Sequence, residues 1–243
     1  MVTVGIINYN NGRFLARAIE SAKSQGADVV VIDDCSTDDS VEIAKSCGVP
    51  VIRHPENSGS GVAGWNDTIE WACDSASDWC VFLSSDDMLA PGAVEEIERH
   101  DCDWLYGDLL LVDENDAPIT EWVYTGWPTD PLTALSRGIH TLSIPVTMFA
   151  AFRYSWLYEN DCVARDFDGL QLAGDTSTCI EWLRKWPRIQ RVPRNLFWYR
   201  QHAGQSTHAL NASREQLHAA IIALYARLFD RKTLDVLKGV YRG

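Results

Sequence analysis

Four short apolar runs alternate with helical patterns in the first hundred residues. The runs are rich in Val, Ile, Leu and aromatic residues, and they are Val2–Ile7, Val29–Ile32, Val49–Ile52 and Trp79–Leu83. Between them apolar residues recur at helical spacing, as at Phe14, Leu15, Ala18, Ile19 and Ala22. Strands that are apolar on both faces and alternate with helices are typical of parallel βαβ units buried between helices. The sequence therefore predicts an α/β fold with a mostly parallel central sheet.

Beyond about residue 103 the pattern becomes more mixed. It predicts strands at 104–111, 121–124 and 146–152, an extended segment at 188–201, and helices at 176–186 and 213–229. No internal repeat, low-complexity segment or clear linker divides the chain. We therefore predict a single domain over residues 1–243, in which a small mixed sheet and C-terminal helices follow the parallel sheet.

Composition and charge restrict the class of protein. Hydrophobic residues make up 46% of the 243 residues and charged residues 23%, which is ordinary for a globular protein. The formal net charge of −13 makes a nucleic-acid partner unlikely, because such binding depends on Lys and Arg. One basic cluster departs from this balance and suits either a phosphorylated ligand or a solvated surface. Its members are Arg184, Lys185, Arg188, Arg191, Arg194 and Arg200.

The cysteines and the hydropathy pattern predict a reduced, cytoplasmic protein. The seven cysteines include no C-x-x-C pair, and several lie within apolar or helical patterns, where Cys behaves as a small hydrophobic residue. No apolar stretch of 18 residues is present, so no transmembrane segment is expected.

Adjacent carboxylates follow two of the predicted strands. Asp33 and Asp34 come directly after Val29–Ile32, and Asp86 and Asp87 lie just past Trp79–Leu83. In open α/β sheets ligands bind outside the carboxyl ends of the strands, where carboxylates suit a divalent cation such as Mn²⁺ or Mg²⁺. The alternative for both pairs is turn or capping chemistry at the start of the next helix.

Two further features suit a nucleotide at the same edge of the sheet. Tyr9 follows the first strand, where its ring could stack on a nucleobase or pack on the neighbouring helix. Gly59 and Gly61 would let the backbone approach a ligand closely.

Motifs in chain order resemble those of the family-2 glycosyltransferases, which have the nucleotide-sugar-binding GT-A fold. Four lie in the first hundred residues, and they are Val4–Asn10, Val29–Asp38, Glu56–Asn66 and Ser84–Pro91. Asp175, followed by Trp182-Leu183-Arg184, is similar to the catalytic-base motif of the family. Tyr199–Ser206 resembles a late Arg-x-His-x-x-Ser motif. The resemblance implies a nucleotide-binding half at 1–100, an acceptor half at 101–210 and C-terminal helices at 211–243.

The resemblance also implies an inverting, metal-dependent transfer of a sugar from a UDP-sugar to a hydroxyl of a carbohydrate or another acceptor. It implies Asp175 as the general base, with Asp166 and Asp168 as nearby competitors. It implies metal ligation by Asp86, Asp87 and His202. The residues that it implies for donor binding are Asn8, Tyr9, Asp33, Asp34, Asn57, Gly59, Asp86 and Arg200.

Three positions depart from the pattern of the family. Ser84 stands where many relatives carry the first Asp of the acidic motif, Trp65 stands where Arg is common, and Gly174 replaces the usual Glu before the base. Because of these departures, a noncatalytic protein that binds nucleotide sugars stays an alternative. A nucleotidyltransferase is a further alternative, disfavoured because no Gly-rich, basic N-terminal loop is recognisable.

Overall fold

The computed structural model describes residues 1–124, 127–141, 149–165, 174–205 and 214–240. Its central sheet begins with four parallel strands in the spatial order β3-β2-β1-β4. Each predicted strand is present, although the third begins at Val51 instead of Val49. The four strands are β1 (Val2–Asn8), β2 (Asp28–Asp33), β3 (Val51–Arg53) and β4 (Trp79–Ser84). Their carboxyl ends all reach the same edge of the sheet, because every pair among them is parallel.

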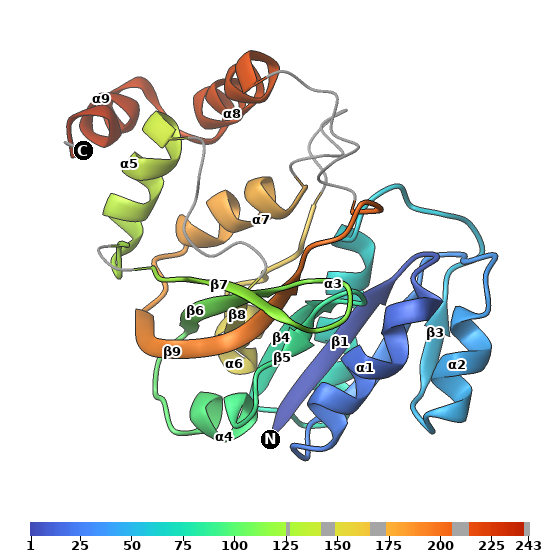
Figure 1. Ribbon diagram of the computed structural model, residues 1–243. Helices are drawn as coiled ribbons and strands as arrows, with labels where there is room; N and C mark the ends of the chain where they lie inside the picture. Colours follow the sequence, from blue (N-terminus) through green and yellow to red (C-terminus); the bar gives the residue numbers. More distant parts are fainter. Residues whose placement is uncertain (125–126, 142–148, 166–173, 206–213, 241–243) are drawn as a thin grey trace.

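Three helices connect these strands and cover both faces of the sheet (Figure 1). They are α1 (Gly12–Lys23), α2 (Ser40–Ser46) and α3 (Val62–Asp74). Helix α1 buries the predicted apolar positions from Phe14 to Ala22. Helix α3 packs against β1, where Gly5 leaves the room that Thr68 occupies. The predicted α/β fold is therefore confirmed in this half of the chain.

The strands of the second half extend the same sheet. Strand β8 (Ala150–Arg153) pairs antiparallel with both β4 and β6 (Trp104–Val112) and so joins the two halves. Strand β9 (Ile189–Arg200) lies parallel to β6 and carries β5 (Met88–Leu89) on its other side. Strand β7 (Pro118–Trp122) pairs with β6 at the surface.

Two strand predictions in this half differ from the structure. The strand predicted at 121–124 is β7 at Pro118–Trp122, and the backbone N–H of Tyr124 donates to the Asp108 carboxylate instead. Its side chains are all exposed, so no apolar alternation marked its bounds. The strand predicted at 146–152 begins at Ala150, while residues 142–148 lie outside the described ranges.

The helices of the second half lie mainly above the sheet in Figure 1. Helices α5, α8 and α9 are joined by polar contacts, such as the Tyr225 hydroxyl that donates to the Leu135 carbonyl at 2.8 Å. Helix α7 begins two residues earlier than predicted and ends at Leu183. The six helices are α4 (Ala93–Glu98), α5 (Pro131–Thr141), α6 (Tyr154–Glu159), α7 (Gly174–Leu183), α8 (Arg214–Leu228) and α9 (Arg231–Val240).

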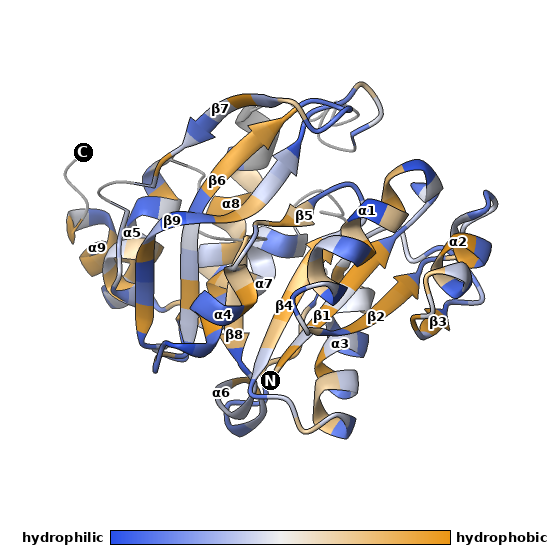
Figure 2. Cartoon of the chain, turned by 60° about the horizontal axis from the view of Figure 1, so that its bottom comes forward, coloured by the Kyte–Doolittle hydropathy of each residue, from blue (hydrophilic) through white to orange (hydrophobic). Residues whose placement is uncertain are grey.

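Strands β1, β2, β4 and β6 supply strongly apolar residues to the core (Figure 2). An aromatic cluster lies between α3, β4, β8 and α7, in which the Trp65 and Phe82 rings stack with centroids 4.8 Å apart. Phe152 and Trp182 meet edge to face at 5.1 Å. Buried aromatic pairs of this kind stabilise a fold beyond their burial alone. Within the described ranges, every helix is too short or too polar to cross a membrane.

Candidate active site

A cavity of about 630 Å³ opens where β1, β2 and β4 end and α7 begins. Six of the sequence-predicted site residues line it, and they are Tyr9, Asp34, Asn57, Gly59, Asp86 and Asp175. They come from five separate segments of the chain. The parallel strands bring the first segments together, and the docking of α7 adds the last.

Asn8 and Asp33 are not brought to the cavity. The Asn8 amide donates to Asp33 Oδ1 at 2.9 Å and to Ser36 Oγ at 3.1 Å, and both Asn8 and Asp33 are fully buried. Asp33 Oδ2 also accepts the backbone N–H of Ser36 at 3.0 Å. These bonds hold the ends of β1 and β2 together, whereas Tyr9 is half-exposed and lines the cavity.

The loop after β3 surrounds the carboxylate of Asp34. The Ser58 backbone N–H lies 3.1 Å from each oxygen of that carboxylate, and the Ser58 hydroxyl lies 2.9 Å from Oδ2. The Asn57 side chain donates to the Asp34 carbonyl at 3.3 Å and accepts the Gly59 N–H at 2.7 Å. Gly59 has φ +77°, a conformation that favours glycine.

His54 links Asp34 to helix α3, a contact that the sequence did not predict. Its Nδ1 lies 2.7 Å from Asp34 Oδ1, and its Nε2 lies 2.7 Å from Asp67 Oδ2. Burial lowers the pKa of His54, but the two carboxylates outweigh that effect, so the pKa is raised above its usual value. No spacing in the sequence marks this residue, because a histidine after a short strand is common in many settings.

Asp86 is held at the cavity by two side chains. Its Oδ1 accepts a hydrogen bond from the Ser84 hydroxyl at 2.6 Å, and its Oδ2 lies 3.0 Å from His202 Nε2. Ser84 therefore orients the carboxylate of Asp86. The structure thus brings Asp86 and His202 together, and their role as metal ligands stays a prediction.

Asp87 and Arg200 face the protein instead of the cavity. Asp87 Oδ1 accepts the Arg200 backbone N–H at 2.9 Å, and burial followed by the charge of Asp86 raises the pKa of Asp87. The Arg200 guanidinium is fully buried and donates to the Asp86 carbonyl and to Asp116. It also lies 4.5 Å from the centre of the Phe14 ring. Arg200 therefore stabilises the Asp86–Asp87 segment from inside the protein.

The hydrogen bonds of His202 determine its tautomer. The Arg13 guanidinium, 2.9 Å away, and the Gly204 N–H, 3.2 Å away, both donate to Nδ1. Because Nδ1 accepts, the hydrogen of a neutral ring lies on Nε2, which donates to Asp86. In this arrangement His202 supports the carboxylate as a hydrogen-bond donor.

The donor atoms at Asp86 suit a divalent cation that is shared with a ligand. Within the described part of the chain, no group of three or more His, Cys, Asp or Glu side chains is placed to hold a metal ion. Mg²⁺ is usually held by one or two carboxylates together with substrate phosphates and water. Asp86 fits that role because it lines the cavity, whereas Asp87 is buried and does not line it.

Asp175 lines the cavity from the first turn of α7. Its Oδ1 accepts the Thr176 backbone N–H at 2.6 Å. Asp166 and Asp168, the competing candidates, lie outside the described residues. Asp175 therefore lies on the cavity, and its role as the base stays a prediction.

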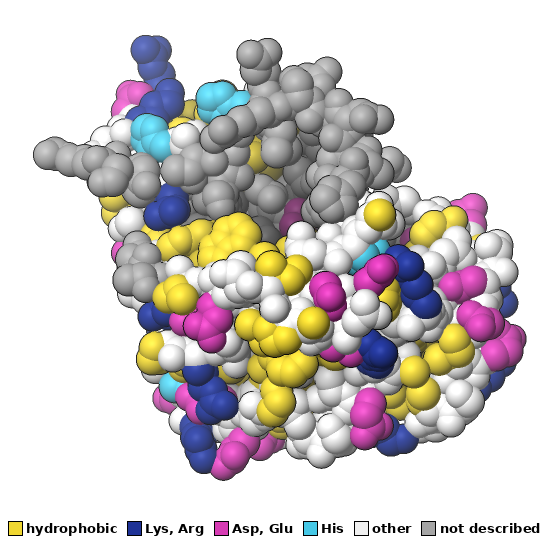
Figure 3. All heavy atoms as spheres, in the orientation of Figure 1, with side chains coloured by type: hydrophobic (Ala, Val, Ile, Leu, Met, Phe, Trp, Pro, Cys, Tyr) yellow, Lys and Arg dark blue, Asp and Glu magenta, His cyan; other side chains and the backbone are white. Residues whose placement is uncertain are grey.

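Aromatic side chains form another part of the cavity lining. Trp65 and Phe82 both line it, although Trp65 is almost fully buried. Trp65 belongs to the aromatic cluster described above. Its packing against Phe82 and Trp182 explains why a Trp stands at this position instead of the expected Arg. On the face shown in Figure 3, Lys and Arg side chains are interspersed with Asp and Glu.

The sequence model of the family described as "Glycosyl transferase family 2" matches residues 3–159. Among individual proteins, an uncharacterised glycosyltransferase from Rickettsia prowazekii is 36% identical over 97 residues, which are 40% of this chain and 32% of that protein. The matched segment therefore spans about a third of that relative.

Solved structures resemble the whole chain at lower identity. The structure of S. aureus TarS 1–349 in complex with UDP has a TM-score of 0.63 and 22% identity, and the match covers 96% of this chain and 73% of TarS 1–349. Glucosyl-3-phosphoglycerate synthase from Mycobacterium tuberculosis, in complex with Mn²⁺, UDP and phosphoglyceric acid, has a TM-score of 0.59 and 18% identity, over 100% of this chain and 80% of that one. Both matches show the GT-A fold.

Proposed function

Since the chain belongs to glycosyltransferase family 2, we propose that it transfers a sugar from a nucleotide sugar to an acceptor hydroxyl. The observation that carries this proposal is the single cavity lined by Tyr9, Asp34, Asp86 and Asp175. An aromatic ring and a hydrogen-bond acceptor suit a nucleobase, and Asp86 suits a cation beside a diphosphate. Asp175 lines the same cavity, as a base that activates the acceptor requires.

The proposed reaction is an inverting displacement at the anomeric carbon. Asp175 accepts the proton of the acceptor hydroxyl as its oxygen attacks, and the bond to the nucleotide diphosphate breaks on the opposite side. Proximity of donor and acceptor in one cavity lowers the entropic cost of this step. A Mn²⁺ or Mg²⁺ ion at Asp86, when bound, stabilises negative charge on the diphosphate.

A UDP-sugar is the proposed donor class. The solved structures of S. aureus TarS and the mycobacterial synthase contain UDP, and the synthase structure also contains Mn²⁺. Asp34 supports the same choice, because an ionised carboxylate accepts a hydrogen bond from the N–H of uracil. A carbohydrate or another hydroxyl compound is the proposed acceptor, and the cytoplasmic location stays a prediction.

Hydrolysis of a panel of nucleotide sugars tests the proposal without knowledge of the acceptor. We expect release of nucleotide diphosphate from one donor with Mn²⁺ or Mg²⁺, and loss of that release with EDTA or in Asp86→Ala. Asp235→Asn, an exposed change on α9, is the matched control and should behave as the unchanged protein.

Binding on the same panel, measured by calorimetry, separates the other outcomes. Metal-dependent binding without turnover, even with mixtures of acceptors, would indicate a noncatalytic nucleotide-sugar-binding protein. If none of the nucleotide sugars binds, the proposed function is rejected.

A further inference from the structure

His54 does not line the cavity, yet it contacts a carboxylate that does. Its ring bridges Asp34, at the end of β2, and Asp67, on α3, with 2.7 Å between each ring nitrogen and its carboxylate oxygen. The side chain of His54 is 17% exposed and that of Asp34 is 8% exposed. Asp67 is more open, with its side chain 26% exposed. The contact between His54 and Asp34 is therefore the sheltered part of the bridge, where screening by solvent is weaker than at the surface.

Two carboxylates on one imidazole require two ring hydrogens. A neutral ring carries one N–H, so its other nitrogen would direct a lone pair at a carboxylate oxygen only 2.7 Å away. An imidazolium ring donates to both oxygens, and such charge-assisted bonds are short and strong. Asp34 and Asp67 are also the charged groups whose effect raises the pKa of His54.

We propose that His54 is a positioning residue for nucleobase recognition, which in its imidazolium form holds Asp34 as an ionised, acceptor-only carboxylate facing the cavity. Asp67 acts behind it by keeping the second ring N–H engaged. This inference rests on the proposed function, because it concerns the base of the nucleotide-sugar donor. It also narrows the proposed donors to nucleotide sugars whose base presents an N–H to a carboxylate.

The bonds around Asp34 leave room for such a base. An ionised carboxylate has about four acceptor positions. His54 and the Ser58 backbone N–H, which lies 3.1 Å from both oxygens, take up three of them. The single hydrogen of the Ser58 hydroxyl is directed at the Ser60 carbonyl, 2.6 Å away. The remaining position suits the N3–H of uracil. Cytosine has an unprotonated N3 at the corresponding atom, and its lone pair would repel the carboxylate.

The proposal predicts a pH dependence of nucleotide affinity with a definite sign. The pKa of His54 is raised above the ordinary value of about 6.5, so the imidazolium form persists below that value and is lost as the pH rises through the raised value. UDP affinity should therefore hold at about pH 6 and fall toward about pH 9, while the preference for UDP over CDP decreases.

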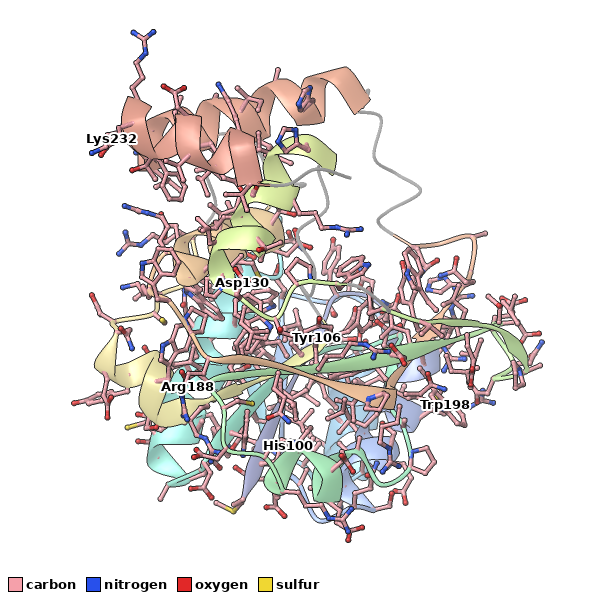
Figure 4. The ribbon with its side chains drawn as sticks, turned by 90° about the vertical axis from the view of Figure 1, so that its left-hand side faces the viewer. His100, Tyr106, Asp130, Arg188, Trp198 and Lys232 are labelled. Atoms are coloured by element: carbon pink, nitrogen blue, oxygen red, sulfur yellow. The ribbon has the colours of Figure 1, made fainter. Side chains whose placement is uncertain are left out.

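Calorimetric titration of UDP and CDP into His54→Gln, Asp67→Asn and the unchanged protein tests this. His54→Gln should bind UDP about tenfold more weakly at low pH, with a nearly flat pH profile, because its amide does not titrate. Asp67→Asn should move the loss of affinity to lower pH. His100→Gln is the matched control, because His100 also pairs with a carboxylate but lies beside α4 and does not line the cavity (Figure 4).

A spectroscopic measurement on the unchanged protein keeps the test independent of how the variants fold. ¹H–¹⁵N NMR of the His54 ring should show hydrogens on both nitrogens near pH 7. A neutral ring there, or a His54→Gln protein that keeps the original affinity and pH profile, would overturn the inference and leave the proposed function intact. Failure of the unchanged protein to bind any nucleotide would instead reject both.

Discussion

Neighbouring carboxylates have different surroundings in both Asp-Asp pairs of this chain. Asp34 and Asp86 line the cavity, whereas Asp33 and Asp87 accept hydrogen bonds from inside the protein. At the end of β2 successive side chains of the extended backbone point to opposite sides, so Asp33 is turned away from Asp34. Asp86 and Asp87 instead follow β4 in a turn, in which the Asp87 backbone N–H donates to the Ser84 carbonyl at 3.0 Å. The sequence predicted where the carboxylates lie, but it could not assign a separate role to each member.

At the same scale, Asp175→Asn should separate catalysis from donor binding. The amide keeps the shape of the side chain and an oxygen that can accept the Thr176 N–H, but it cannot take a proton. We expect the rate of donor hydrolysis to fall by about 10²- to 10⁴-fold. Calorimetry should show UDP affinity within about threefold of the unchanged protein.

A hydrolysis rate equal to that of the unchanged protein would remove Asp175 as the base. Asp166 and Asp168, which precede the same helix in the chain, would then be the candidates for the base.

At the scale of elements, the contact between β1 and α3 sets the shape of the cavity. A Cβ atom on Gly5 would lie 1.8 Å from the Thr68 Oγ1 atom, and one on Gly64 would lie 2.9 Å from an Ile7 side-chain carbon. The absence of both side chains lets the helix approach the strand closely. Helix α3 also carries Trp65 and Asp67 toward the site, so its distance from the sheet affects the lining of the cavity.

Gly5→Ala should therefore destabilise the protein. Because overpacking forces side chains and backbone apart, we expect the free energy of unfolding to fall by about 1–3 kcal/mol in a urea titration. Gly239→Ala is the matched control, since a Cβ at that helical position meets no atom within 4 Å. It should be neutral or stabilise by up to about 1 kcal/mol. Equal urea midpoints of unfolding for the two variants would contradict the close approach of α3 to β1.

The elements that were predicted are those whose side chains follow a local rule. Strands β1, β2 and β4 are apolar on both faces, and α1 has a clear apolar stripe. The sequence did not predict helices α5 and α6 or the two-residue strand β5. Helix α6 and strand β5 are short, and they depend on contacts with residues distant in the chain. The insertion of β8 between β4 and β6 is likewise a long-range pairing that no local pattern encodes.

At the scale of the whole molecule, the cavity joins the two halves of the chain. Residues before 90 supply most of its lining, while Gly174, Asp175 and Gly204 come from the second half. The Asn66 side chain of α3 reinforces this junction, because it accepts the Ala164 N–H at 2.8 Å and donates to the Ala164 carbonyl at 3.0 Å. A ligand in the cavity therefore contacts both halves at once.

Donor binding should consequently raise the thermal stability of the entire chain. At a UDP concentration of about 100 times Kd, mass action stabilises the folded state by about 2.7 kcal/mol. For a protein of this size that corresponds to a rise in Tm of roughly 5–10 °C in a calorimetric scan with Mn²⁺. EDTA should reduce the rise, and ADP should produce little. A rise of equal size with ADP would argue against recognition of the base.

The pairing of Asp86 with His202 has a consequence for how the protein reaches its folded state. The two residues are 116 positions apart, and they meet only once β9 has docked beside β5 and β6. Closing so long a loop is slow, because its entropic cost precedes the contacts that compensate for it. We therefore expect the parallel half to gain protection from hydrogen exchange during refolding before the proposed cation site at Asp86 is complete. That site would then form among the last events of folding.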